Sequence, residues 1–224
     1  MQSIRVLSSL ALKGALEKFR TDFERALGPL ELGFDATQAI LPRVRAGERA
    51  DCLILTAEAM DELLASGAVT RARALGSSGI GVAVRTGAPR PDISTVEALK
   101  SALVCARSVA HSRVGASGLY FVELIERLGI AARLKKRVVV EKGPVGLVVA
   151  AGEAELGVQQ LCELAPVPGI DIVGPLPEPV QKLTCFAGGI AATAANPQGA
   201  LALLELLRSE RLRDAMIAGG LQPR

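Results

Sequence analysis

A serine- and glycine-rich turn beginning at His111 is the part of the sequence whose residue types are best suited to chemistry. It reads HSRVGASGLY and follows an apolar run, residues 102–106, which we predict to be a buried strand. A turn that leads from a strand into a helix gathers backbone N–H groups and hydroxyls, which can hold a small anion. The sequence therefore predicts an anion-binding turn that contains Ser112, Ser117 and Gly118.

The single histidine, His111, stands at the start of this turn. Imidazole changes its charge near neutral pH, so it suits the transfer of a proton to or from a substrate. Lys142, just before Gly143 and Pro144, is a second catalytic candidate, as a base or a charge clamp. The structural alternative for His111 is a side chain that caps a strand or lies on the surface. One histidine excludes a histidine-rich metal centre, and we expect neither a metal nor a cofactor.

Repeated strand–helix units are the elements that must position these residues. Right-handed crossovers turn such units into parallel sheets covered by helices. Apolar strands and helical patterns alternate along residues 4–7, 10–27, 30–34, 37–47, 51–55, 57–67 and 80–84. We therefore expect an α/β protein with two Rossmann-like lobes joined by two crossover strands, near residues 80–90 and 174–188. Lobe I is predicted to comprise residues 1–82 and 184–224, and lobe II residues 83–183.

Ligands of open α/β sheets bind beyond the carboxyl ends of the strands. We therefore expect a small anionic ligand in a cleft between the lobes. Polar or backbone groups expected at this cleft belong to Ser8, Ser9, Asp35, Thr37, Ser112, Ser117, Gly118, Val145, Gln159 and Gln160. The hydroxyls could instead cap helices, and the glutamines could hold a crossover. Asp35 is open to two roles, a base or a helix cap.

Charge and hydropathy exclude several classes of partner. The formal net charge is +3, and the basic residues are scattered apart from a cluster at residues 133–137. We therefore expect no nucleic-acid partner. No segment has the roughly 20 apolar residues that a membrane span needs, so no membrane insertion is expected. The first strand follows Met1 without a leader pattern, which predicts a cytoplasmic protein, or a periplasmic one if a leader was removed.

Four widely spaced cysteines favour neither a metal site nor a disulfide framework. They are Cys52, Cys105, Cys162 and Cys185. We predict that Cys52 and Cys105 lie in buried strands, where thiols usually act as small apolar side chains.

Several motifs, taken in order, resemble the molybdate-binding-protein family of solute-binding proteins. The resemblance covers nearly the whole chain and is carried by residues 6–9, 44–51, 81–94, 116–130, 152–157, 168–170 and 206–209. It implies a type II periplasmic-binding-protein fold that holds an oxyanion through hydroxyls and backbone amides. Aconitate isomerase is an enzyme similar to this same family, so the resemblance also implies that the fold supports chemistry on tricarboxylates.

Two departures from the family pattern bear on the ligand. Asp35-Ala36-Thr37 stands where molybdate binders usually have Ser-Ser or Gly-Ser, and Gln159-Gln160 stands where they often have a tyrosine. An acidic group is unfavourable beside a dianion, whereas amides suit carboxyl or hydroxyl groups. We therefore expect a cytosolic isomerase of an unsaturated di- or tricarboxylate. The alternative is a binding protein without catalysis that serves a molybdate-type ABC transporter, a partner expected only if the chain is exported. A ligand-sensing regulatory domain is a third, weaker alternative.

Overall fold

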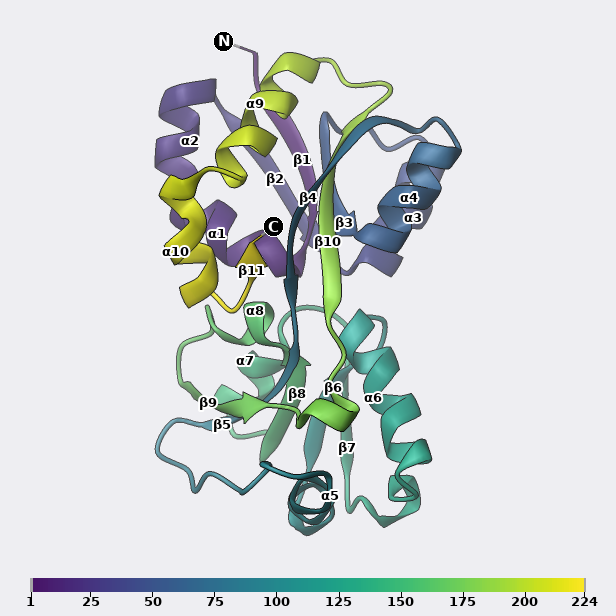
Figure 1. Cartoon of the computed structure of the whole chain (residues 1–224), viewed down its shortest axis with the longest axis vertical. Coiled ribbons are helices and arrows are strands. Elements are labelled where there is room, and N and C mark those ends of the chain that lie inside the picture. The colour runs from purple at the N-terminus through teal and green to yellow at the C-terminus, as the bar shows by residue number, and fades with distance from the viewer. Residues whose placement is uncertain (1, 224) are drawn as a thin grey trace. The chain divides into compact units, whose positions relative to one another are not determined.

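The computed structural model describes residues 2–223, which form two α/β units (Figure 1). Unit 1 contains the described residues up to Ser78 and those from Thr184 onward, and unit 2 contains Gly79–Leu183. The expected α/β class, with two sheets, is confirmed. The chain enters unit 2 after Ser78, whereas the sequence placed this division after residue 82, so the whole strand Ile80–Arg85 belongs to unit 2.

Unit 1 is built on a six-stranded sheet with the order β11-β4-β10-β3-β1-β2. β1 runs parallel to β2 and β3, whereas β10 runs antiparallel to both β3 and β4. The strands are β1 (Ile4–Ser9), β2 (Leu30–Asp35), β3 (Cys52–Thr56), β4 (Val69–Ser78), β10 (Thr184–Ala191) and β11 (Gln222–Pro223).

Helices cover both faces of this sheet. α3 and α4 lie on one face, and α1, α2, α9 and α10 lie on the other (Figure 1). Their bounds are α1 (Lys13–Lys18), α2 (Arg20–Leu27), α3 (Thr37–Arg45), α4 (Ala57–Ala65), α9 (Pro197–Leu207) and α10 (Glu210–Ala218). The single helix expected over residues 10–27 is wrong. A 3₁₀ turn (Leu10–Leu12) precedes α1, and Phe19 leaves the helical region between α1 and α2.

Unit 2 is built on a five-stranded sheet with the order β7-β6-β8-β5-β9. β6 is parallel to β7 and β8, while β5 is antiparallel to β8 and β9. The strands are β5 (Ile80–Arg85), β6 (Val109–Ser112), β7 (Arg137–Val140), β8 (Leu156–Gln160) and β9 (Ile170–Pro175). The helices are α5 (Val96–Cys105), α6 (Ala116–Arg127), α7 (Val145–Ala150) and α8 (Leu161–Leu164), with 3₁₀ turns at Ala131–Arg133 and Glu178–Val180.

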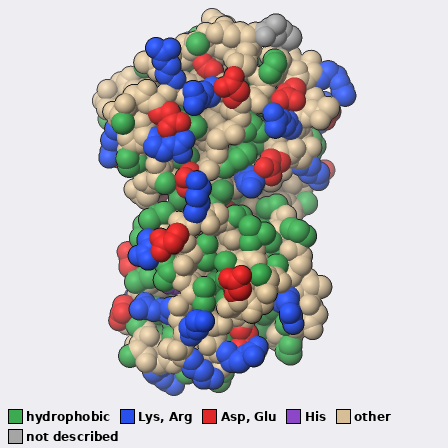
Figure 2. Space-filling model, turned by 180° about the vertical axis from the view of Figure 1, so that it is seen from behind, with side chains coloured by type: hydrophobic (Ala, Val, Ile, Leu, Met, Phe, Trp, Pro, Cys, Tyr) green, Lys and Arg blue, Asp and Glu red, His purple; other side chains and the backbone are tan. Residues whose placement is uncertain are grey.

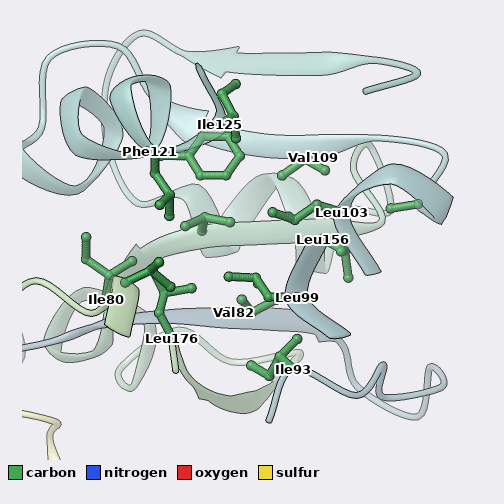
Figure 3. Close-up of a cluster of buried hydrophobic side chains, with 14 of the residues drawn as sticks. Ile80, Val82, Ile93, Leu99, Leu103, Val109, Phe121, Ile125, Leu156 and Leu176 are labelled. Carbon is green, nitrogen blue, oxygen red and sulfur yellow. The ribbon is translucent and has the colours of Figure 1, made fainter. Parts of the chain in front are cut away.

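The main core of unit 2 lies between α5, α6 and the sheet (Figure 3). Leu99 and Leu103 of α5 and Phe121 and Ile125 of α6 are buried there, with Val109 of β6. Successive residues of a strand point to opposite faces. Ala110 accordingly belongs to a second cluster, formed with Val145 and Val149 of α7 on the opposite face. α7 is thus held to the sheet by its own apolar side chains.

The strand predicted at residues 102–106 is wrong, because these residues form the end of α5 and its C-cap. A short apolar run fits a buried helix as well as a buried strand. The Thr95 side chain accepts a hydrogen bond from the Ala98 N–H, so it caps α5. The strand before the turn is instead β6, which contains His111. The expectation for Cys105 is also wrong, because its side chain is exposed, whereas Cys52 is buried as expected.

β4 is a long strand that the sequence did not reveal. Its first half carries Arg71 and Arg73 and is largely exposed, and its second half, Leu75–Ser78, is fully buried. Neither half alternates apolar with polar residues, which is the usual signal of a half-buried strand. β4 is nevertheless the longest strand of the described chain and the principal partner of β10.

Basic and acidic side chains are interspersed on the face seen in Figure 2. Ion pairs between such side chains occur in both units, for example Arg43 with Glu48 and Arg113 with Glu141. Over residues 2–223, none of the helices combines the length and the apolar character that a membrane crossing requires.

Candidate functional site

Four of the candidate residues gather where the parallel strands of unit 1 end. Ser9, the last residue of β1, lies opposite Asp35, the last residue of β2. Thr37 begins α3 two residues later, and its Oγ1 accepts a hydrogen bond from the backbone N–H of Thr56, at the end of β3 (3.3 Å). The neighbouring strand ends therefore bring these polar groups to one edge of the sheet. We call Ser8, Ser9, Asp35 and Thr37 the unit 1 group.

The two serines of this group differ in their hydrogen bonding. Ser8 is fully buried, and its hydroxyl donates to the backbone oxygen of Ser9 (2.9 Å). Ser9 is also buried, but its Oγ has no hydrogen-bond partner among the described residues. A buried hydroxyl without a partner costs free energy. Ser9 therefore has hydrogen-bonding capacity to offer a ligand.

Asp35 takes part in local electrostatic contacts. Its Oδ1 accepts a hydrogen bond from the Ala36 N–H (2.9 Å), and its Oδ2 lies 3.9 Å from a guanidinium nitrogen of Arg43. The side chain does not cap α3, since Ala36 is the N-cap and has no side-chain acceptor. Arg43 is itself held by Glu48 through two hydrogen bonds, of 2.6 and 2.8 Å. This pairing offsets part of the negative charge that Asp35 brings to the unit 1 group.

In unit 2, the turn between β6 and α6 is tightly built. The Ser112 Oγ accepts a hydrogen bond from the Gly115 N–H (3.0 Å), so this serine closes the turn. A Cβ on Gly118 would lie 1.9 Å from the Ser112 carbonyl oxygen, so only glycine fits there. Ser117 is buried in the first turn of α6. The expected anion-binding turn is therefore rigid, with Ser112 engaged in its closure.

His111 lies within β6 and is buried, with 3% of its surface exposed. Its ring contacts Phe121 at a centroid distance of 5.3 Å. Nδ1 lies 3.0 Å from the Ser112 carbonyl oxygen, which can only accept a hydrogen bond, so Nδ1 carries a proton. Nε2 is buried and has no hydrogen-bond partner among residues 2–223.

The surroundings of His111 favour its neutral form. Burial lowers its pKa, the hydrogen bond to Ser112 opposes this shift, and the charges of Arg137 and Arg113 lower the pKa further. Near neutral pH the imidazole is therefore uncharged, with a lone pair on Nε2. This is the state of a proton acceptor.

Gln159 is held between two other groups of unit 2. Its Oε1 accepts a hydrogen bond from the Val145 N–H at the start of α7 (2.7 Å), and its Nε2 donates to Glu163. The side chain is buried, and so is that of Gln160 beside it. The Val145 N–H, expected to contact a ligand, is thus already engaged by Gln159. We call His111, Ser112, Ser117, Gly118, Val145, Gln159, Gln160 and Glu163 the unit 2 group.

The structure adds Glu163, in α8, which the sequence analysis did not identify. Burial raises the pKa of this carboxyl to about 7, although the hydrogen bond from Gln159 opposes the shift. The sequence signal that could have identified Glu163 is its position four residues after Gln159, a buried glutamine near the end of a strand. Lys142, by contrast, is an exposed residue of the loop after β7. The ligand role of each residue, and the expected cleft between the lobes, stay predictions.

Comparisons with known proteins place the chain in a family. A protein of Pseudomonas sp. named aconitate isomerase is 40% identical over 232 residues, which cover 99% of this chain and 88% of that protein. The periplasmic molybdate-binding protein of Azotobacter vinelandii has a similar fold, with a TM-score of 0.81, 16% identity and coverage of 97% of this chain and 98% of that one.

The sulfate-binding protein SubI of Mycobacterium tuberculosis is also similar in fold. Its TM-score is 0.71 at 14% identity, and the match covers 100% of this chain and 87% of that one. These structures share the periplasmic-binding-protein-like fold that the sequence predicted. The family described as bacterial extracellular solute-binding protein matches residues 4–222. The chain therefore belongs to the bacterial extracellular solute-binding protein family.

Proposed function

We propose that this protein is an isomerase that shifts a proton and a double bond within an unsaturated di- or tricarboxylate. The relative named aconitate isomerase supports the substrate class, because its 40% identity extends over 99% of this chain. The solved oxyanion-binding proteins share the fold at much lower identity, 16% and 14%. The family membership supports a small solute as the ligand.

The observation that carries the proposal is the state of His111. Its Nδ1–H is tied to the Ser112 carbonyl oxygen, and its buried Nε2 has no hydrogen-bond partner among the described residues. A neutral imidazole held in one tautomer, with a free basic nitrogen, is the arrangement that proton abstraction requires.

The proposed reaction moves one proton and two pairs of electrons, because the C–H pair enters the new double bond while the π pair of the original double bond moves to the far carbon. His111 Nε2 takes a proton from the saturated carbon between a carboxylate and the double bond. The released electron pair forms a new C=C bond, and negative charge spreads onto the conjugated carboxylate. The proton then returns to the far carbon of the original double bond. Hydroxyls such as those of Ser9 and Ser117 are proposed to stabilise the charge on the carboxylate.

Solvent exchange tests this proposal directly. Incubation with trans-aconitate in deuterium oxide should place deuterium on the allylic carbon and produce the isomer. His111→Ala should slow this exchange by roughly 10²- to 10⁴-fold, the usual contribution of an acid–base group. Lys142→Ala should retain most of the exchange, since Lys142 is exposed. Loss of exchange in Lys142→Ala alone would assign the base to Lys142, and no exchange on any of several unsaturated acids would exclude the isomerase.

A second candidate function is oxyanion binding for a molybdate-type ABC transporter. It is favoured by the fold similarity to the Azotobacter vinelandii periplasmic molybdate-binding protein, with a TM-score of 0.81. This function predicts that molybdate and tungstate raise the melting temperature more than tricarboxylates do. It also predicts an exported precursor, whereas the isomerase is proposed to be cytoplasmic. Fractionation of cells that express the native gene distinguishes the two locations.

A further inference from the structure

Glu163 is a half-buried carboxyl that the proposed reaction does not use. It lies in the short helix α8, which directly follows β8. One carboxyl oxygen accepts a hydrogen bond from Gln159 Nε2. No cation is paired with it among the described residues, unlike Glu155, whose carboxylate is bound by Arg107 in the same unit. Glu163 is therefore placed next to a residue of the candidate site and has no counter-charge.

The side-chain amide of Gln159 links Glu163 to α7, because it is hydrogen-bonded to both. The Val145 N–H is a donor, so the Gln159 atom that faces it must be the oxygen Oε1. Nε2 is then turned toward Glu163, which must accept. The two hydrogen bonds fix one orientation of the amide and connect a titratable carboxyl to the first residue of α7.

The elements packed against α8 contribute few other charges. α7 and β8 contain no ionisable side chain. β5 contributes Arg85, the last residue of that strand. α8 instead follows Gln160, which pairs with Ile80 at the other end of β5. β9 contributes Asp171, which is paired with Arg90 at 3.3 Å. Lys142 belongs to the loop before α7. Burial and Gln159 remain the causes that shift the pKa of Glu163 to about 7.

We propose that Glu163 is a positioning residue of the ligand site, which acts through Gln159 on the first turn of α7 and takes up a proton when an anion binds. The physical reason is that a bound anion and an ionised Glu163 repel one another across a poorly solvated region. Anion binding therefore favours the protonated carboxyl, which can still accept the Gln159 hydrogen bond through its carbonyl oxygen. The second half of the proposal rests on the proposed function, because it assumes a carboxylate ligand.

The first experiment needs no ligand. In a pH titration followed by NMR, the side-chain amide of Gln159 and the backbone amide of Val145 should shift with one midpoint near pH 7. Glu163→Gln keeps an acceptor for Gln159 but cannot titrate, so both shifts should disappear while the spectrum stays folded. Glu126→Gln, which removes an exposed carboxylate from α6, is the control and should leave both shifts in place. Amide shifts that ignore pH in the wild type would overturn the positioning role.

The second experiment measures binding of tricarballylate, a saturated tricarboxylate that cannot be isomerised. The affinity of the wild type should fall as the pH rises from 6.0 to 8.5. As proton linkage requires, this fall should be roughly threefold to tenfold larger than the fall measured for Glu163→Gln. Comparing the two proteins at each pH cancels the titration of the ligand and of His111. Identical pH profiles, or no binding at any pH, would overturn the proton-uptake half of the proposal.

The two proposals can fail separately. Deuterium exchange without a Glu163-dependent pH profile would leave the isomerase standing and remove this inference. A Glu163-dependent profile without exchange would leave a proton-linked anion-binding protein and remove the isomerase. Glu163→Leu gives a further check, since Gln159 then loses its acceptor and tricarballylate should bind more weakly at every pH.

Discussion

The carboxyl ends of the parallel strands carry polar side chains in both units, but these side chains differ in kind. The unit 1 group offers hydroxyls and a carboxylate near a cation, with Asp35 3.9 Å from Arg43. The unit 2 group contains His111, whose pKa is lowered by burial, and Glu163, whose pKa is raised to about 7. The unit 1 group offers hydrogen-bonding groups, whereas the unit 2 group also contains two groups with shifted pKa values.

This difference matters because the solved structures with a similar fold include proteins named for binding molybdate and sulfate, and binding alone requires no proton transfer. Titratable groups with shifted pKa values cluster at sites of chemistry more often than elsewhere. The contrast favours unit 2 as the location of the catalysis proposed above.

The largest effect is expected for a methyl group added to the turn of unit 2. In Gly118→Ala, the new Cβ would lie 1.9 Å from the Ser112 carbonyl oxygen, a backbone atom held by β6. We expect a loss of roughly 3 kcal/mol or more in the free energy of unfolding, measured by urea denaturation, because the backbone must move.

Gly33→Ala in β2 is the matched change in unit 1. There the new Cβ would lie 2.9 Å from Leu7 Cδ2, the end of a side chain that can change its rotamer. We expect a smaller loss, of about 1 kcal/mol. Equal losses in the two variants would contradict the view that the unit 2 turn is the more rigid of the two regions.

An intermediate effect is expected for the pH dependence of stability. The pKa of Glu163 is about 7 in the folded protein and near its ordinary 4.5 in the unfolded chain. The folded state thus binds this proton more tightly. The stabilisation that the folded state gains from binding this proton is complete below pH 4.5 and is lost as the pH rises through 7.

Glu163→Gln should therefore be more stable than the wild type at pH 8, by roughly 1–3 kcal/mol after allowance for partial exposure. Thermal denaturation at pH 5 and pH 8 measures this difference, which should be smaller at pH 5. Glu126→Gln should show no such dependence. A Glu163→Gln variant less stable than the wild type at pH 8 would contradict the raised pKa.

The smallest effects are expected for the two serines of unit 1. Ser8→Ala removes a buried hydrogen bond to the Ser9 carbonyl oxygen and should cost about 1 kcal/mol. Ser9→Ala removes a buried hydroxyl without a partner among the described residues, so the ligand-free protein should keep its stability or gain slightly. Affinity for tricarballylate should nevertheless fall in Ser9→Ala. A clear loss of stability without ligand would show that Ser9 has a structural role.

Sequence patterns identified most of the strand–helix units because these depend on local periodicity. The strands beginning at Ile4, Leu30 and Cys52 were expected within one residue. The apolar run at residues 102–106 was assigned to the wrong element, since periodicity alone does not separate a short strand from a buried helix. β4 was not predicted because neither of its halves alternates apolar with polar residues.

The candidate site was only partly accessible from the sequence. Motifs indicated which polar residues lie near the ends of strands, such as Ser9 and Gln159. They could not show that Ser112 is used to close its turn, nor that the His111 tautomer is fixed by a carbonyl oxygen. The pKa of Glu163 depends on burial by residues distant in sequence, which no local pattern reports.

The sheet order of unit 1 has a consequence for how the chain folds during synthesis. β10 lies between β3 and β4, yet it is made more than 100 residues after them. Unit 2 is one continuous segment, so it can be completed while unit 1 still lacks this central strand. Domains generally fold as units during translation. We therefore expect the region that carries His111 and Glu163 to reach its native structure first, and the region with the hydroxyls to wait for the end of the chain.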